Sequence, residues 1–107
     1  MRKGKVFISD VYAGIIEETD EGYLFSYDLT YLKDNKAPVS ITMPLKDSPY
    51  FSKTLFPFFD GLIPEGWLLD VVAHNWKLNP SDRFGIMLAA CKDPIGNVSI
   101  SEVCDVL

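Results

Sequence analysis

Hydrophobic residues in the first half of the chain fall into short segments, and in some of these they alternate with polar residues, which is the pattern of β-strands with one buried face. In residues 39–43, for example, Val, Ile and Met alternate with Ser and Thr. A turn signal at Thr19–Gly22 separates two of the hydrophobic segments, and its glycine is free to adopt positive φ. The pattern predicts strands at Lys5–Ser9, Val11–Glu18, Tyr23–Tyr27 and Val39–Met43, the last of them ended by Pro44.

The segments around the fourth predicted strand are typical of connections. Tyr31–Lys36 is predicted to be a polar connection, and the Ser-Pro signal within Asp47–Phe51 predicts a loop. Lys53–Phe59 is rich in aromatic and aliphatic residues, but Pro57 prevents a long regular helix there.

The second half of the chain changes to a helical pattern. Pro64 suits the first turn of a helix, where its missing N–H costs nothing, and we expect this helix to run to about Lys77. Ser81 or Asp82 is placed to cap a second helix, over Asp82–Cys91. Alternation returns at Val98–Val103, which predicts a closing strand.

Strands followed by helices and a final strand predict the α+β class. We expect a small, mostly antiparallel sheet with two to three helices packed on one face. A length of 107 residues, 48% of them hydrophobic, is enough for one domain over 1–107 with a core of its own. No window reaches the length of a membrane span, and acidic residues interrupt the segment after the basic N-terminus, so we expect a cytoplasmic protein.

The charge balance argues against a nucleic-acid-binding protein. The chain carries 15 acidic and 10 basic side chains, for a formal net charge of −5. Proteins that neutralise phosphates cluster their lysines and arginines, whereas here they are scattered along the sequence. In a cytoplasmic protein, the default state of Cys91 and Cys104 is a reduced pair of thiols.

No combination of residues predicts an enzyme, a metal site or a cofactor. The chain has no Gly-Lys-Ser/Thr phosphate loop, and Arg83 separates Asp82 from the Phe-Gly that follows it, so Asp82 is interpreted as a helix cap. His74 is the single histidine, and Asp70, four residues earlier, is its expected surface partner on the helix. A catalytic role for His74 would need a nucleophile that the sequence does not supply.

The predicted helix over Pro64–Lys77 carries an unusual second stripe. Leu68, Leu69, Val72 and Trp76 share the face expected to pack on the core. Trp67, Val71 and His74 lie at i, i+4 and i+7, mostly on the other side. Exposed tryptophan is a common anchor of protein interfaces, so the stripe is either a partner contact or is packed beneath the aromatic loop over 47–59. The helical pattern alone does not decide between a partner contact and packing within the domain.

Two runs of this sequence resemble the N-terminal subdomain of HipA-type toxin kinases. They are Phe58–Gly66 (FFDGLIPEG) and Asp82–Ala90 (DRFGIMLAA), followed by Gly96–Val98, and the resemblance extends over nearly the whole chain. It implies a HipA-N-terminal-subdomain-like fold. In that family the subdomain precedes a kinase core that phosphorylates serine or threonine on glutamyl-tRNA synthetase or a related synthetase, and we expect this chain to be the subdomain without that core. The chain departs from the family by placing Trp67 directly after Pro-Glu-Gly.

A free-standing domain of this kind resembles the HipS antitoxins of tripartite HipBST toxin–antitoxin systems. The resemblance implies a partner, a shortened HipT-like kinase that lacks this subdomain, and a larger complex with a HipB-like helix-turn-helix DNA-binding protein. The implied role is inhibition, by docking where the missing subdomain would sit and obstructing the active site. The residues expected to contact the kinase are Phe59, Asp60, Glu65, Gly66, Trp67, Asp70, Val71 and His74.

Two other functions remain open at this point. The chain is alternatively a non-inhibitory accessory subunit of a split kinase, or a scaffold to the DNA-binding subunit, because docking has the same sequence signature in each case. A small enzyme is the least supported, since no nucleophile, base and metal set converges in the sequence.

Overall fold

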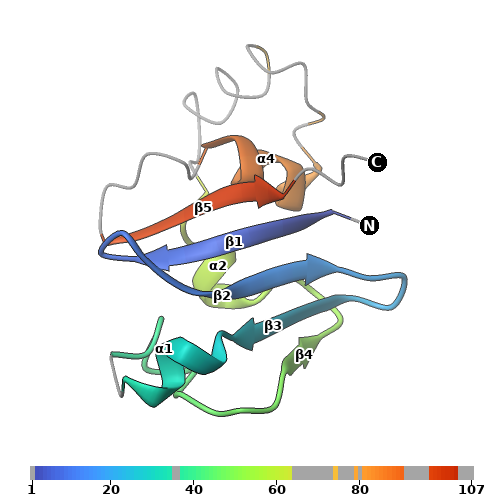
Figure 1. Ribbon diagram of the computed structural model, residues 1–107. Helices are drawn as coiled ribbons and strands as arrows, with labels where there is room; N and C mark the ends of the chain where they lie inside the picture. The colour runs from blue at the N-terminus through green and yellow to red at the C-terminus, as the bar shows by residue number, and fades with distance from the viewer. Residues whose placement is uncertain are drawn as a thin grey trace.

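A five-stranded antiparallel sheet is the centre of the fold (Figure 1). The computed structural model describes residues 2–34, 37–63, 74, 79, 81–90 and 97–103. The strands follow the order β4-β3-β2-β1-β5, and every neighbouring pair is antiparallel. Their bounds are β1 Lys3–Ile8, β2 Val11–Glu18, β3 Tyr23–Tyr27, β4 Tyr50–Ser52 and β5 Val98–Val103. This arrangement confirms the predicted α+β fold.

Three described helices accompany the sheet: α1 Leu29–Lys33, α2 Pro57–Asp60 and α4 Arg83–Ala90. Gly4, Ile16 and Phe25 are cross-strand neighbours in β1, β2 and β3, so they share one face of the sheet. The α2 residue Phe59 packs on Phe25 with ring centroids 5.3 Å apart, and α4 places Leu88 over Gly4. Both α2 and α4 therefore cover the same face, and the core lies between them and the sheet.

Two glycines allow close packing that a side chain would prevent. A Cβ built on Gly4 would lie 2.8 Å from side-chain carbons of both Leu88 and Ile100, so the absence of a side chain lets α4 approach the sheet. A Cβ on Gly22, in the β2–β3 turn, would lie 2.2 Å from the carbonyl oxygen of Ser52 in β4. Because Gly22 has no side chain, the edge strand β4 can pair with β3 next to this turn.

The segment 39–43 is a tight turn, so the predicted strand there is wrong. Ser40 and Met43 form only an isolated bridge, with the Met43 N–H donating to the Ser40 carbonyl at 3.0 Å. Val39 and Met43 are buried, but Ile41 between them is 96% exposed. The backbone groups that a strand would pair are instead bonded to Tyr27, whose hydroxyl accepts from the Val39 N–H at 2.9 Å and donates to the Met43 carbonyl.

Replacing Tyr27 with phenylalanine is expected to destabilise the protein by about 1–3 kcal/mol, because a buried N–H and a carbonyl lose their shared partner. Burial also raises the pKa of the Tyr27 hydroxyl, so it stays protonated as a donor at neutral pH. Chemical denaturation measures the loss. The matched control is Tyr50→Phe, which removes a more exposed hydroxyl donating to the Pro44 carbonyl, and an equal loss in both variants would contradict this account.

Two smaller predictions need correction. A short helix, α1, extends into the predicted polar connection at Tyr31–Lys36 because the Asp28 carboxylate caps it, accepting from the Tyr31 N–H at 3.3 Å. The predicted loop over 47–51 contributes to an edge strand, since Tyr50–Ser52 pairs with β3 as β4. As predicted, the segment 53–59 forms no long regular helix, and the one turn of helix at α2 starts at Pro57 in the first helical position.

The end of the chain agrees with the sequence where the structure describes it. The second predicted helix is α4 and the closing strand is β5. The predicted helix over 64–77 lies outside the described residues, except that His74 is helical. In the described part of the chain, no helix is long and apolar enough to cross a membrane.

Candidate functional site

Three of the predicted partner-contact residues lie in the described structure. Phe59 and Asp60 belong to α2, and His74 is helical and exposed. The others, Glu65, Gly66, Trp67, Asp70 and Val71, lie outside the described residues. The candidate site is therefore built here from α2, from the start of α4 and from the chain around them.

Phe59 is a core residue. Its side chain has no exposed surface, and its ring packs against Phe25 and Phe58, with centroids 5.3 and 5.2 Å away. Such a side chain has no surface with which to contact a partner, contrary to the direct contact expected from the sequence. Its place in α2 instead fixes the neighbouring Asp60 at the surface.

Asp60 pairs with Arg83 at the surface. The Arg83 Nε donates to Asp60 Oδ1 at 2.7 Å, and its Nη2 lies 3.4 Å from the Asp60 carbonyl oxygen. Asp60 ends α2 and Arg83 begins α4, so this contact joins two helices that are separated in the chain. The two side chains are 42% and 30% exposed, which leaves the pair accessible to solvent and to a partner.

Arg2 forms a second ionic contact at the N-terminus of α4. Its guanidinium is bidentate to Glu18, at 3.0 and 2.7 Å, and to Asp82, at 2.7 and 2.9 Å. It also lies over the Phe84 ring, 5.4 Å from the centroid. Asp82 accepts from the Gly85 N–H at 3.2 Å, so the predicted cap of this helix is confirmed. The hydrogen bonds from Arg2 lower the pKa of both carboxyl groups.

These lowered pKa values predict a loss of stability in acid. The ordinary pKa values are 4.5 for Glu18 and 3.8 for Asp82, and the folded values lie below them. The contribution of the two carboxylates is therefore complete above about pH 4.5 and is lost as the pH falls through their folded pKa values. Replacing Arg2 with glutamine is expected to flatten this part of the curve of unfolding free energy against pH. Lys5→Gln, an equal change of charge on an exposed residue, should leave it unchanged, and identical curves for all three proteins would contradict the assignment.

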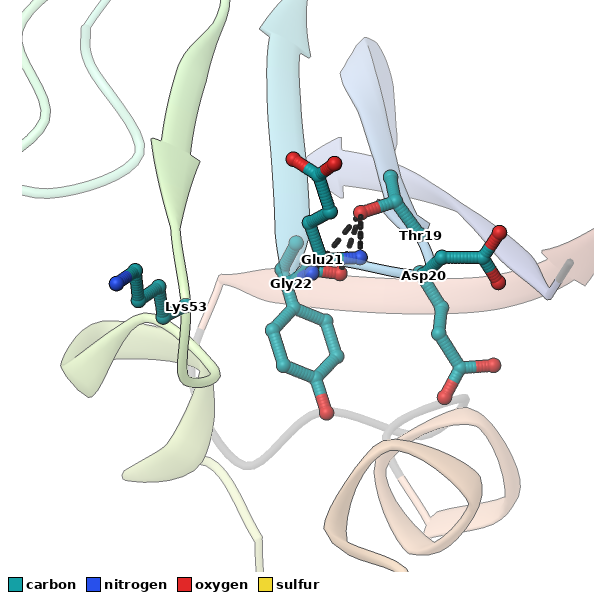
Figure 2. A pocket seen from close by; sticks show the side chains of 7 residues that line it. Thr19, Asp20, Glu21, Gly22 and Lys53 are labelled. Atoms are coloured by element: carbon teal, nitrogen blue, oxygen red, sulfur yellow. Dashed lines mark hydrogen bonds between the residues drawn. The ribbon is translucent and has the colours of Figure 1, made fainter.

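Two adjoining hollows lie beside these contacts. The first is lined by the β2–β3 turn, where the Thr19 hydroxyl accepts from the Gly22 N–H at 3.0 Å, with Lys53 on the opposite side (Figure 2). The second shares Tyr23 and Lys53 with the first and reaches the Asp60–Arg83 pair. Their linings contain no histidine, cysteine or serine. Within the described ranges, no group of three or more His, Cys, Asp or Glu residues is arranged to hold a metal ion.

Sequence reasoning missed both arginines. The sequence pattern gives Arg2 no role beyond that of one scattered basic residue, and it places Arg83 only between Asp82 and Phe-Gly. Arg2 and Asp82 are 80 positions apart, and no periodicity links them. Only the antiparallel pairing of β1 with β5, together with the packing of α4 against β5, brings the two residues together.

Comparison with known proteins identifies the domain. The model of the HipA N-terminal domain family matches residues 4–101. The chain belongs to the HipA N-terminal domain family. A solved structure described as the N-terminal domain of HipA toxin has the same fold as this HipA N-terminal domain, with a TM-score of 0.77 and 33% sequence identity over 99% of this chain and 96% of that chain.

A relative of similar length matches almost the whole of this chain. A protein of Haemophilus influenzae, described as uncharacterized, is 37% identical over 102 residues, which covers 95% of this chain and 93% of that protein. The relative therefore consists of little more than this HipA N-terminal domain. Both runs that carried the resemblance in the sequence, Phe58–Gly66 and Asp82–Ala90, lie within the matched residues.

Proposed function

We propose that this protein is an antitoxin that binds and neutralises a shortened, HipT-like serine/threonine kinase. The observation that carries the proposal is the match of a HipA N-terminal domain to residues 4–101, together with a relative that is little more than this domain. A domain that occurs beside a kinase in HipA, and occurs without one in the relative, is suited to act on a kinase supplied as a separate chain.

The proposed mechanism is steric. The chain docks where the kinase lacks its N-terminal subdomain and presents the region from Asp60 to His74 towards the catalytic cleft. Trp67 then acts as a wedge that prevents the cleft from closing, since kinase activity depends on the positioning of its loops and lobes. Glu65, Gly66, Asp70, Val71 and His74 contribute to the same surface.

The described structure supports a binding role. The exposed Asp60–Arg83 pair and the exposed His74 offer polar groups at the rim of such an interface, where charges adjust specificity and association rate. We further propose that the complex is cytoplasmic and includes a HipB-like helix-turn-helix protein. That subunit would contact DNA, since a net charge of −5 makes direct binding by this chain unfavourable.

Growth on co-expression tests the proposal. Cells induced for a cognate short, HipT-like kinase should stop growing, and co-expression of this chain should restore growth while the two proteins co-purify. Unchanged or increased toxicity despite co-purification would overturn the antitoxin role in favour of an accessory subunit of a split kinase. Absence of co-purification would overturn the kinase as the partner.

A further inference from the structure

The chain between α1 and β4 contains an exposed segment, residues 37–44, that forms no regular helix or strand (Figure 1). Three tyrosines from different elements bond its main chain: Tyr27 of β3, Tyr31 of α1 and Tyr50 of β4. The main-chain groups that they bond are the carbonyls of Ala37, Met43 and Pro44 and the N–H of Val39. Hydrogen bonds to three separate elements fix the conformation of this segment within the fold itself.

The segment displays an isoleucine almost wholly to solvent. Ile41 is 96% exposed, whereas Val39 and Met43 on either side of it are buried. The segment contains no charged side chain, although 23% of the residues in the chain are charged. Its exposed residues are Ala37, Pro38, Ile41, Thr42 and Pro44. A fixed, uncharged and partly apolar surface is typical of the centre of a protein interface, where charged residues are depleted.

The segment lies on the same side of the sheet as α2, which carries Asp60 of the proposed kinase interface. Tyr27, which bonds the segment, and Phe59 of α2 both pack on the Phe25 ring, with centroids 4.9 and 5.3 Å away. Tyr27 and Phe25 are two positions apart in β3, so their side chains share one face. A partner that docks beside α2 therefore approaches the face of the sheet near which Ile41 is displayed.

The contacts predicted from the sequence are too few for a stable complex. A standard protein interface uses about 20–30 residues on each side. Eight residues were predicted, and Phe59 among them is buried in the core, which leaves seven. A stable complex with the kinase therefore requires further contact surface on this domain.

We propose that Ile41 is an anchor for the short kinase and inserts into an apolar pocket on the surface that the missing subdomain would cover. This inference rests on the proposed function, since it extends the same interface to a second region of the domain. A surface that a subdomain covers in a longer kinase is partly apolar, so it suits an aliphatic side chain. Because the tyrosines already fix the segment, little conformational entropy is lost when it docks.

The test measures the affinity of the purified full chain for the short kinase, with the thermal midpoint of each variant beside it. Ile41→Ala is expected to weaken binding about 10- to 50-fold, because most of the buried aliphatic surface is lost. Ile41→Asp should weaken it at least about 100-fold, since a charge would enter an apolar pocket. Ile41→Leu, which keeps the volume, should bind within about 3-fold of the wild type.

The exposure of Ile41 makes this test independent of folding. Because the side chain is 96% exposed in the free chain, the thermal midpoint should change by no more than about 4 °C in each variant. Phe51→Asp is the matched control, since it introduces the same charge at a ring that is 51% exposed. Phe51 pairs with Leu24, which alternates with Phe25, so it lies on the other face of the sheet. This variant should bind the kinase like the wild type.

Several results would overturn the inference. Wild-type affinity in Ile41→Asp would show that the kinase does not contact the segment. An equal loss of affinity in Phe51→Asp would show an effect of charge and not of position. Self-association of the wild-type chain that Ile41→Asp abolishes, with kinase binding unchanged, would assign the segment to a second copy of this chain. Failure of the unaltered chain to bind the kinase would contradict the proposed function as well, and the wild-type titration alone reveals it.

Discussion

Trp67→Ala is expected to lower the affinity for the kinase by about 2–4 kcal/mol, the typical cost of truncating a tryptophan anchor at an interface. The proposed wedge depends on this indole, which the helical pattern places away from the core face. Inhibition should therefore fail in cells at expression levels at which the wild-type chain restores growth. Titration of the kinase with the purified variant measures the affinity, and the thermal midpoint measures stability.

The chain offers its second tryptophan as the matched control. Trp76 is predicted on the core face of the same helical pattern. Trp76→Ala should therefore lower the free energy of unfolding, and it should weaken inhibition only because less of the protein is folded. Full inhibition by Trp67→Ala would contradict the wedge. Equal losses of stability in both variants would show that Trp67 belongs to the core.

Phe59→Ala is expected to destabilise the fold by about 3–5 kcal/mol, because it removes a fully buried ring and leaves a cavity beside Phe25. That is a large share of the roughly 5–15 kcal/mol by which a domain of this size is stable. Inhibition should fail as the folded fraction falls. Urea denaturation measures the loss directly.

Phe51→Ala is the control for this prediction, since it is the same chemical change at a ring that is 51% exposed in the edge strand β4. It should cost less than about 1 kcal/mol. If Phe59→Ala keeps wild-type stability but loses binding, Phe59 contacts the kinase and its burial in the core has no energetic role.

Much of the fold was predictable because its signals are local. β2 and β3 are rich in β-branched, aliphatic and aromatic residues, and β5 begins with alternating Val, Ser, Ile and Ser; the predicted bounds of all three strands agree with the structure. The cap at Asp82 likewise marked the start of α4, because a carboxylate before an apolar run is a signal within one turn of helix. Each of these features depends on neighbours in the sequence.

The turn at 39–43 shows where local patterns fail. Its alternation is as regular as that at the start of β5, yet Ile41 points to solvent because the Tyr27 hydroxyl takes the hydrogen bonds that a neighbouring strand would have taken. That hydroxyl lies 12 positions from Val39 and 16 from Met43. Hydrogen bonds to a residue so far away in the sequence cannot be predicted from the alternation within residues 39–43.

The candidate site was less predictable than the fold for the same reason. The motif around Phe59 and Asp60 was found by its resemblance to a family, but the resemblance did not distinguish a buried ring from an exposed carboxylate. The Asp60–Arg83 pair spans 23 positions and depends on the packing of α2 against α4. Sequence alone therefore located the region and did not assign the role of each residue in it.

The most direct test of the central claim is the activity of the short kinase with the purified chain added. Transfer of labelled phosphate from ATP to a protein substrate is measured as the chain is titrated, with Trp67→Ala as the control protein. The account predicts that activity falls to background at saturating wild-type chain and persists with the variant. Activity that stays unchanged or rises while the two proteins form a complex would contradict it.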